Sequence, residues 1–342
     1  MAARKLRVGV TSDALLENGE PFFDAKALGI LDGEPRIAWE YLPAPGKKFS
    51  ADDCAAFDVI CVVKAGIDAS ALGRADLRLR LLAGFGAGYD TRDVAALTRA
   101  GVLITNNPDA VRRPMATTQL TFILALAHKL MVKDRITREG RWGDQRRHYG
   151  VGLRGRTLGS LGVGNIGKEL FRIAAPLDMR FIAHDPFAKP ADVAPLGVTL
   201  VEIETLFRES DFLVVNVPLL ETTRKLVSAR LIALMKPSAY LISAARGPIV
   251  DEAALHRALA ERRIAGAGID VFEVEPTPKD NPLLELDNVI VAPHALCHTD
   301  ECNRLLAEGS FRSAAAFANG KRPPQLINPE ALKHPRLAGW VA

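Results

Sequence analysis

The sequence predicts an α/β fold built on doubly wound parallel sheets, and three observations support this prediction. Short apolar runs alternate with helical segments through most of the 342 residues, and such alternation is typical of a parallel sheet. One of these runs leads into the spacing G-x-G-x-x-G at Gly162, Gly164 and Gly167. A further run at 180–184 ends in the carboxylate of Asp185. Strand, glycine turn, helix, strand and acid follow in the order of a dinucleotide-binding unit.

Each glycine of the motif has its own role in this interpretation. Gly162 permits the tight turn, Gly164 lets a pyrophosphate approach the main chain, and Gly167 lets the next helix lie close to the sheet. One face of that helix is apolar, with Ile166, Leu170, Ile173, Ala174 and Leu177. Because the amino end of a helix attracts anions, the phosphates of a dinucleotide are expected there.

Asp185 lies close to the offset of about 20 residues at which an acid accepts hydrogen bonds from the adenosine ribose. A carboxylate would repel the 2′-phosphate of NADP, and Pro186, Phe187 and Ala188 supply no cation. NAD is therefore the expected cofactor. The alternative is that Asp185 is a solvated turn residue before a proline.

Length and composition exclude several classes of protein. A chain of this length is sufficient for about two domains, and 48% hydrophobic and 25% charged residues are ordinary for a globular protein. The net charge of +4 is small, so no affinity for nucleic acid or membrane is expected. Cys54, Cys61, Cys297 and Cys302 have no metal-ligand spacing. With no apolar run of membrane-spanning length and no export signal at the start, we expect a cytoplasmic protein with reduced thiols.

The first third of the chain is predicted to contain strands at 6–11, 59–63, 79–83 and 102–105. The second of these strands is followed by Lys64-Ala65-Gly66, and the third by the sequence FGAGYD at 85–90. Both are candidate binding loops, because ligands of open α/β sheets bind at the carboxyl ends of strands. Turn geometry alone would explain Gly86 and Gly88 equally well.

A long helix is predicted to begin at Pro114 and continue through Met131, because proline is favoured in a first helical turn. Its apolar face is long for a monomer's surface, so we expect a homodimer whose contact includes Leu120, Ile123 and Leu124.

The next segment, 138–152, is polar and basic. A solvated linker is the first expectation, and binding of a phosphate by Arg146 or Arg147 is the alternative.

Strands and helices alternate again after Asp185. Strands are predicted at 212–217, 240–243, 266–270 and 289–292, and helices at 203–208, 229–235 and 252–261. With the strands around the glycine motif, this gives six or seven strands, enough for a complete dinucleotide domain. A last helix is expected from Thr299 to about Ala318, with a tail that returns to cover the first domain.

Arg246, Glu275 and His294 each follow a predicted strand, so they are expected to converge on one edge of the sheet. Singly, they could be a surface cation, a loop acid before a proline and a strand-end histidine. Together they are the three groups that reduction of a 2-oxo acid requires. Arginine orients a planar carboxylate, histidine with a pKa near 6.5 transfers the proton, and a glutamate bonded to the imidazole favours its charged form.

Several motifs in order resemble the D-isomer-specific 2-hydroxyacid dehydrogenase family, which includes glyoxylate and hydroxypyruvate reductases and phosphoglycerate dehydrogenase. They are FGAGYD at 85–90, LRGRTLGSLGVGNIG at 153–167, VNVPLLETT at 215–223, ARGPIVDEAAL at 245–255, GAGIDVFEVEP at 266–276 and VAPH at 291–294. The resemblance implies two Rossmann-like domains with a hinge near Arg112 and near Glu301. A doubly wound NAD-binding domain, 113–300, would be inserted into a flavodoxin-like substrate domain, 1–112 and 301–342.

The resemblance also implies roles for individual residues. Arg246 would bind substrate, His294 would be the acid/base and Glu275 its partner. The implied cofactor contacts are Gly162, Gly164, Asn165, Ile166, Gly167, Asp185, Val217, Pro218, Thr223, Ala244, Ala245 and Asp270. The implied substrate contacts, besides Arg246, are Lys64, Ala65, Gly66, Ala87 and Gly88. A homodimer through the NAD-binding domain is implied as well.

The sequence departs from the family pattern at three places. Ser243-Ala244-Ala245 stands where asparagine and threonine usually precede the alanine, and Thr117 occupies a helix position that is commonly glutamate. Leu296-Cys297-His298 follows His294 where small residues are frequent, which concerns the choice of substrate and not the reaction. His298 lacks the preceding proline of His294, so His294 is expected to be catalytic.

The leading hypothesis is hydride transfer between NAD(H) and a small 2-oxo or D-2-hydroxy acid such as glyoxylate or hydroxypyruvate. A formate- or phosphite-type dehydrogenase on the same scaffold is the alternative among enzymes. Outside enzymes, the alternative is an NADH-sensing interaction protein like the C-terminal-binding corepressors. The intact set of Arg246, Glu275 and His294 weighs against the last alternative.

Overall fold

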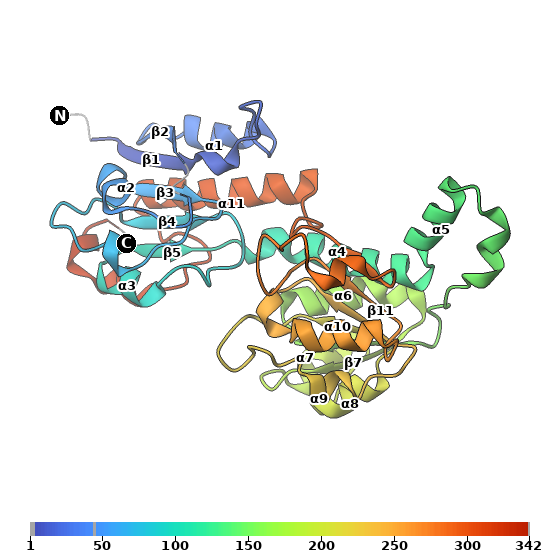
Figure 1. Cartoon of the computed structure of the whole chain (residues 1–342). Coiled ribbons are helices and arrows are strands. Elements are labelled where there is room, and N and C mark those ends of the chain that lie inside the picture. Colours follow the sequence, from blue (N-terminus) through green and yellow to red (C-terminus); the bar gives the residue numbers. More distant parts are fainter. Residues whose placement is uncertain (1–3, 44–45, 341–342) are drawn as a thin grey trace. The chain divides into compact units, whose positions relative to one another are not determined.

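The computed structural model describes residues 4–43 and 46–340 (Figure 1). It divides into two compact units, each with its own parallel sheet. Unit 1 contains Met1–Val111 and His298–Ala342, and unit 2 contains Arg112–Cys297. Two chain segments therefore build unit 1, while unit 2 is continuous.

Unit 1 has a five-stranded parallel sheet in the order β2-β1-β3-β4-β5. This is the flavodoxin-like order. The strands are β1 (Leu6–Thr11), β2 (Ile37–Leu42), β3 (Val59–Val62), β4 (Leu81–Gly84) and β5 (Leu103–Thr105). The helices are α1 (Gly29–Asp32), α2 (Ala51–Ala56), α3 (Val94–Arg99) and α11 (Asp300–Ala318). The edge strand β2 is absent from the sequence prediction, and only its two ends, Ile37 and Leu42, are buried.

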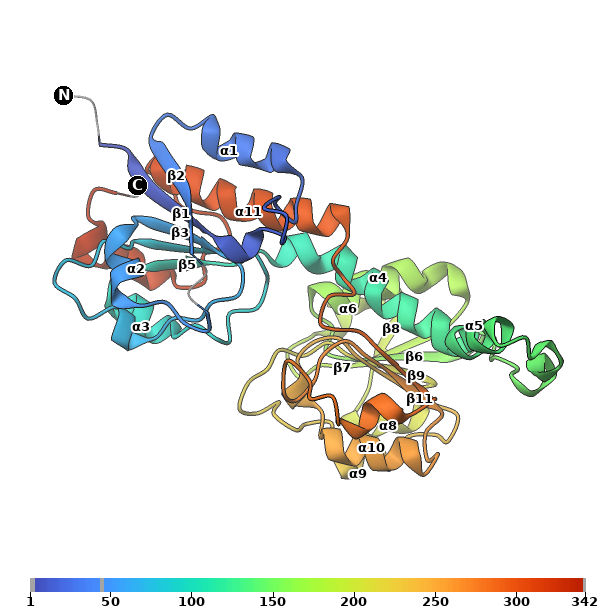
Figure 2. The ribbon, with the colours of Figure 1, turned by 45° about the horizontal axis from the view of Figure 1, so that its top comes forward.

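Helices cover both faces of this sheet, α1 and α11 on one face and α2 and α3 on the other (Figure 2). The predicted last helix is confirmed, with Thr299 as its N-cap. The tail beyond it returns to β5, as predicted. There the side chain of Asn328, fully buried, accepts a hydrogen bond from Ile104 N at 2.9 Å and donates one to Val102 O at 2.9 Å.

Unit 2 has a seven-stranded parallel sheet in the order β12-β11-β10-β9-β6-β7-β8. The chain reverses direction of winding beside β6, as in a Rossmann fold. The strands are β6 (Thr157–Leu161), β7 (Arg180–His184), β8 (Val198–Leu200), β9 (Phe212–Val215), β10 (Tyr240–Ser243), β11 (Gly266–Ile269) and β12 (Val289–Val291). The helices are α5 (Leu130–Arg138), α6 (Asn165–Ala174), α7 (Pro190–Val193), α8 (Ile203–Glu209), α9 (Ala229–Ile232) and α10 (Glu252–Ala260).

Strand β9 shows why this sheet is wound on both faces. Its four residues are all fully buried. Phe212 and Val214 pack in the core with α4 (Pro108–Ala127), α6 and α7, whereas Leu213 and Val215 pack with α8, α9 and α10. Side chains alternate between faces along a strand, so a continuous apolar run requires helices on both sides. The predicted doubly wound domain is confirmed.

Two expectations about the long helix are wrong. Helix α4 begins at Pro108 and contains Pro114 in its interior, and it ends at Ala127 before Lys129, which has a left-handed φ of 53°. Pro108 occupies the first turn, so Pro114 is not needed to start the helix. Ile123 is fully buried in the core of unit 2, which removes it from any contact between subunits. Leu124 is 36% exposed.

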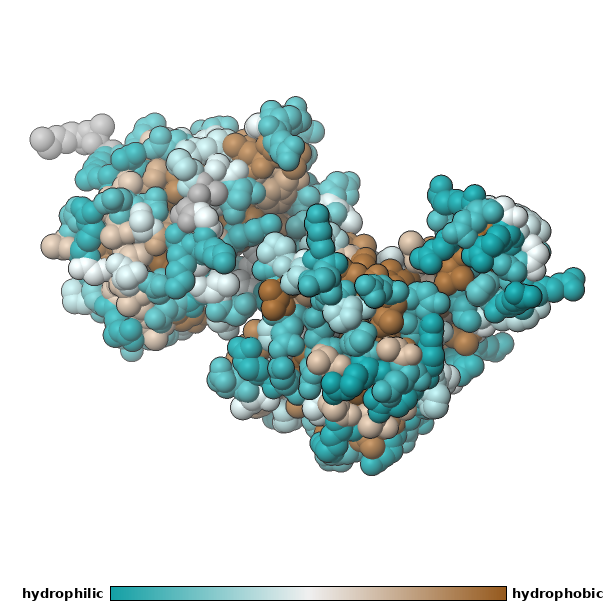
Figure 3. Space-filling model, in the orientation of Figure 1, coloured by the Kyte–Doolittle hydropathy of each residue, from teal (hydrophilic) through white to brown (hydrophobic). Residues whose placement is uncertain are grey.

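No single helix among residues 4–43 and 46–340 is long and apolar enough to cross a membrane. Taken together, α4 and α5 would pass on length and composition, although a bend of 57° separates them. In the space-filling view, unit 2 has a largely hydrophilic surface with scattered apolar residues (Figure 3).

Candidate active site

The glycine motif forms the turn between β6 and α6. Gly162 has a φ of 91°, and a Cβ there would come within 2.9 Å of the main-chain carbon of Asn216. A Cβ on Gly167 would come within 2.8 Å of Gly162 O, so only glycine allows α6 to lie this close to the turn. A Cβ on Gly164 would meet nothing within 4 Å, which leaves open space at the amino end of α6. The tight turn at Gly162 and the close helix at Gly167 are as predicted, while the approach of a pyrophosphate to Gly164 stays a prediction.

Asp185 follows β7 directly and is bonded to the glycine turn. Its Oδ2 accepts a hydrogen bond from Val163 N at 2.9 Å, and its Oδ1 accepts one from Phe187 N at 2.9 Å. The carboxylate is only half-buried. It is thus held beside the helix terminus and is more than a solvated turn residue, the alternative left open above.

These features fit a dinucleotide. A helix of ten residues directs its first N–H groups into the open space above Gly164, where a pyrophosphate can approach. Asp185 would then accept hydrogen bonds from the ribose hydroxyls. Asn165 and Ile166, in the first turn of α6, are exposed and half-buried.

The remaining residues with an implied cofactor role follow β9 and β10. Val217 and Pro218 come directly after Asn216, whose side chain turns inward and donates to Ser160 Oγ at 3.0 Å. The Thr223 hydroxyl is used within its own turn, since it donates to Pro218 O at 2.6 Å. After β10, Ala244 is buried and Ala245 is half-buried.

His294 and Glu275 form a hydrogen-bonded pair. The imidazole Nδ1 lies 2.7 Å from Glu275 Oε2, and the two side chains are 43% and 36% exposed. Glu275 Oε1 also accepts from Phe272 N at 2.9 Å, so both carboxylate oxygens have a partner. His294 has a φ of 56°, a left-handed conformation that residues other than glycine rarely adopt. Such conformations cluster at functional sites.

Arg246 and Asp270 occupy the neighbouring strand ends. The Arg246 guanidinium, half-buried, donates from Nη1 to Ala245 O at 2.8 Å. Asp270, 1% exposed, accepts from the main-chain nitrogens of Ala295 at 3.1 Å and Leu296 at 3.3 Å. The carboxylate therefore holds the chain that immediately follows His294. This is a positioning role in addition to the implied cofactor contact.

The predicted substrate loops belong to unit 1. Lys64 N donates to Asp13 Oδ2 at 3.2 Å. Gly66 N donates to Lys47 O at 2.9 Å, so this N–H is already engaged in the main-chain network. Ala87 O accepts from Asn106 Nδ2 at 2.8 Å, and Gly88 is half-buried beside it. His298 also falls in unit 1, just before α11.

The sequence did not indicate a second layer of polar residues around Glu275. Glu252 accepts hydrogen bonds from Glu273 N and from Asn281 Nδ2, each at 2.8 Å. Lys225 Nζ pairs with Glu273 Oε1 at 2.9 Å. The sequence feature that could have indicated this role is the adjacent acidic pair Asp251-Glu252 at the start of a helix. Only Asp251 acts as the N-cap of that helix.

Two of the buried cysteines, Cys54 and Cys61, contribute no reactive thiolate. Burial raises the pKa of Cys54 to about 12, and that of Cys61 also to about 12, so both thiols stay protonated at neutral pH. All four cysteines are free of disulfide bonds.

Comparisons with known proteins agree with this geometry. Residues 120–295 match the family model described as the NAD binding domain of D-isomer specific 2-hydroxyacid dehydrogenases. A glyoxylate reductase of Korarchaeum cryptofilum is 37% identical over 301 residues, which cover 86% of this chain and 90% of that protein. One from Aeropyrum pernix is 39% identical over 273 residues, covering 78% and 81%.

Solved structures share the fold. A D-lactate dehydrogenase from Aquifex aeolicus, complexed with NAD and lactic acid, superposes with a TM-score of 0.79 at 24% identity over 92% of this chain and 96% of that chain. The family match covers the glycine turn, Asp185, Arg246, Glu275 and His294. The chain therefore belongs to the D-isomer-specific 2-hydroxyacid dehydrogenases and is an NAD-dependent oxidoreductase that acts on 2-hydroxy acids.

Proposed function

We propose that this enzyme reduces a small 2-oxo acid, glyoxylate or hydroxypyruvate, to the 2-hydroxy acid, with His294 as the acid/base. The single observation that supports this most is the 2.7 Å contact between His294 Nδ1 and Glu275 Oε2. Because Nδ1 faces the carboxylate, Nε2 is the ring nitrogen that transfers the proton. The names of the curated relatives make glyoxylate the first substrate to test.

Bound NADH supplies the hydride that reaches the carbonyl carbon. The carbonyl oxygen gains negative charge as this happens, and the proton on Nε2 of His294 passes to it. Glu275 favours the protonated ring and fixes its orientation. Arg246 orients the substrate through its fixed fork of donors. The net change adds one hydride to carbon and one proton to oxygen.

An absorbance assay at the NADH band tests the substrate, with glyoxylate, hydroxypyruvate, formate with NAD, and phosphite with NAD. Turnover with a 2-oxo acid is the expected result. Turnover with formate or phosphite alone would indicate the alternative dehydrogenases. Tight NADH binding without any turnover would indicate an NADH-sensing protein.

We also infer that unit 2 mediates a homodimer. Four large apolar side chains around α5 are at least half exposed: Leu130 at 55%, Met131 at 50%, Trp142 at 69% and Tyr149 at 74%. Contiguous exposed apolar residues favour a protein interface. Light scattering is expected to return twice the mass of one chain. The role of Lys64, Ala65, Gly66, Ala87 and Gly88 in substrate binding stays a prediction, as does a cytoplasmic location.

A further inference from the structure

Glu252 links the loop that bears Arg246 to the loop that bears Glu275. It is the first residue of α10 and ends the connection from β10. Its Oε2 accepts from Glu273 N, and its Oε1 accepts from Asn281 Nδ2, both at 2.8 Å. One carboxylate thus holds two points of the loop that follows β11, on either side of Glu275.

Asn281, the second of these points, is itself held by further hydrogen bonds. Its side chain is 8% exposed, and its Nδ2 also donates to Thr277 Oγ1 at 2.8 Å. Its Oδ1 accepts from Leu283 N at 3.0 Å. Both protons on Nδ2 are therefore used, and the amide cannot turn over without losing these bonds. The segment from Glu273 to Asn281 is fastened at both ends.

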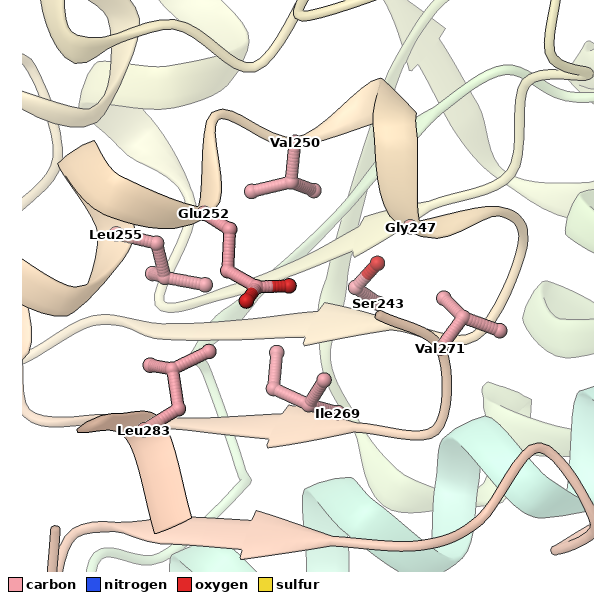
Figure 4. A pocket seen from close by; sticks show the side chains of 8 residues that line it. All are labelled: Ser243, Gly247, Val250, Glu252, Leu255, Ile269, Val271 and Leu283. Carbon is pink, nitrogen blue, oxygen red and sulfur yellow. The ribbon is translucent and has the colours of Figure 1, made fainter. Parts of the chain in front are cut away.

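The surroundings of Glu252 explain why its partners matter. Figure 4 shows the carboxylate among Val250, Leu255, Ile269 and Leu283, between the ends of β10 and β11. The cavity that these residues line is about 10 Å³, room for a single water and too small for a substrate. A carboxylate with such apolar neighbours is costly unless it is hydrogen-bonded. Glu252 is half-buried in this setting, and its two hydrogen bonds join it to the loop.

The two loops also touch through their main chains. A Cβ on Gly247 would lie 1.8 Å from Phe272 O and 2.6 Å from Glu273 N. Phe272 N is the donor to Glu275 Oε1. Glu275 lies two residues after Glu273, so a shift of the main chain at Glu273 would also move Glu275.

We propose that Glu252 is a positioning residue for the reaction: it holds the loop so that Glu275 Oε2 stays within hydrogen-bonding distance of His294. It does not touch the reacting atoms. This inference rests on the proposed roles of Glu275 and His294. Loss of Glu252 would release Glu273 N and Asn281 Nδ2, and a resulting shift of about 1 Å at Glu275 would be enough to break the 2.7 Å hydrogen bond to His294.

Charged groups around this loop include Arg246, Asp270, Lys225 and Glu273, and the loop itself carries Lys279 and Asp280. Lys225 pairs with Glu273, and Asp270 bonds to the main chain after His294. The Glu252 variants leave these six groups in place but remove the charge of Glu252 itself, and adding Glu252→Ala to Glu275→Gln separates movement of the loop from that loss of charge.

The experiment uses the full-length protein with Glu252→Ala and Glu252→Gln. Two readouts are followed: the pH profile of reduction, with KM and kcat separated, and the NMR titration of the His294 ring in protein without cofactor, assigned by comparison with His294→Ala. We expect both midpoints to move to lower pH in Glu252→Ala, in the direction of Glu275→Gln, with kcat falling up to about tenfold at neutral pH and KM nearly unchanged. In a protein that already carries Glu275→Gln, adding Glu252→Ala is expected to move the profile no further.

Rescue and control variants separate this role from general stability. In Glu252→Gln with Asn281→Asp, the amide donates to the new carboxylate and its oxygen still accepts from Glu273 N, so the parent profile is expected to return. Glu204→Gln is the matched control, since Glu204 lies in the first turn of α8 in the same unit and pairs with Arg230 at 3.0 Å. It is expected to leave the profile unchanged.

The outcomes are distinguishable. If Glu275→Gln moves the midpoints and folded Glu252 variants do not, the inference is overturned and the proposed function stands. If Glu275→Gln moves neither midpoint, the proposed function is overturned and this inference with it. If Glu252→Ala does not fold, Glu252→Gln and its rescue by Asn281→Asp decide the matter by the same two readouts.

Discussion

The parallel strands of unit 2 begin at one side of the sheet, here called the amino edge, and end at the other, the carboxyl edge. Both carry charged residues, in different arrangements. At the amino edge, Asp211 is 8% exposed and accepts from Thr157 N at 2.8 Å. Two cations surround it, with Lys236 Nζ at 3.0 Å and Arg156 Nη1 at 3.6 Å. At the carboxyl edge, Glu275 has 36% of its side chain exposed, and its side-chain partner is a histidine.

Unit 1 repeats the first arrangement. Asp58, 3% exposed, accepts from Arg7 N at 2.8 Å and pairs with Arg78 at 2.7 Å and Arg80 at 3.2 Å. Both units therefore contain a buried aspartate that accepts a hydrogen bond from the start of a strand and pairs with cationic side chains. The difference suggests a division that can be tested: buried, paired charge at the amino edges for stability, and half-exposed charge at the carboxyl edge of unit 2 for the proposed chemistry. Each prediction below tests one side of this contrast.

The largest effect is expected at the carboxyl edge. His294→Ala removes the proton donor, so turnover is expected to fall roughly 10²- to 10⁴-fold. NADH affinity and the melting temperature are expected to stay close to those of the parent, because the imidazole side chain is 43% exposed and belongs to the loop after β12, whereas the glycine turn follows β6. Steady-state kinetics and NADH titration check this. A variant that kept most of its turnover would show that another group donates the proton.

Arg246→Lys is expected to act on substrate binding. The charge remains, but the two-pronged geometry is lost. Since a hydrogen bond to a charged group contributes about 1.5–3 kcal/mol, KM is expected to rise roughly ten- to hundredfold. Measuring KM for the 2-oxo acid and Kd for NADH separates the two sites. An unchanged KM would remove Arg246 from the substrate contact.

At the amino edge, Asp211→Ala is expected to reduce stability and leave chemistry unchanged. The substitution leaves the buried N–H of Thr157 without its acceptor and removes the partner of Lys236. It is expected to lower the free energy of unfolding by about 2 kcal/mol. Urea unfolding measures this, with kcat as the second readout. Asp287→Ala is the control, because the Arg262–Asp287 pair is exposed and is expected to contribute less than about 1 kcal/mol.

A smaller effect is expected for the choice between NADH and NADPH. Because Asp185 would face the 2′-phosphate, NADH is expected to exceed NADPH at least tenfold in catalytic efficiency, or about 1.4 kcal/mol. Parallel assays with the two reduced cofactors decide this. Equal efficiencies would mean that the carboxylate, although fixed by Val163 N and Phe187 N, does not reach the ribose.

The smallest effect is expected from Glu275→Gln, which keeps the shape of the side chain. The carboxylate at 2.7 Å favours the protonated ring, and the neutral amide does not. Reduction, which needs the protonated ring, is therefore expected to lose its rate at lower pH than in the parent. Oxidation, which needs the neutral ring, is expected to extend to lower pH. Superimposable profiles in both directions would contradict the pairing.

The sequence predicted the structure correctly at positions where one physical requirement determines the type of residue. The glycine spacing and Asp185 predicted the turn, because only glycine fits at Gly162 and Gly167. The continuous apolar strands of unit 2 predicted their own burial on both faces. The pair of His294 and Glu275, 19 residues apart, is found in contact as the resemblance implied.

Prediction failed where a contact between distant residues decides the structure. Ile123 has the same apolar pattern whether it packs inward or against a second subunit, and packing against the sheet of unit 2 decides for the interior. Strand β8 is absent from the sequence prediction, and only Val198 of its three residues is buried. The role of Glu252 depends on Asn281, 29 residues away, and no local pattern records that hydrogen bond.

The division of unit 1 between the two chain ends has a consequence for biosynthesis. A ribosome completes unit 2 at Cys297 before it has made α11 or the tail. Ile104 in β5 receives its hydrogen bond to Asn328 only 224 residues after it has been synthesised. Unit 2 can therefore fold first, while only α1 covers one face of the unit 1 sheet until α11 emerges. During that interval the nascent chain exposes residues of β3 and β4 that α11 later covers.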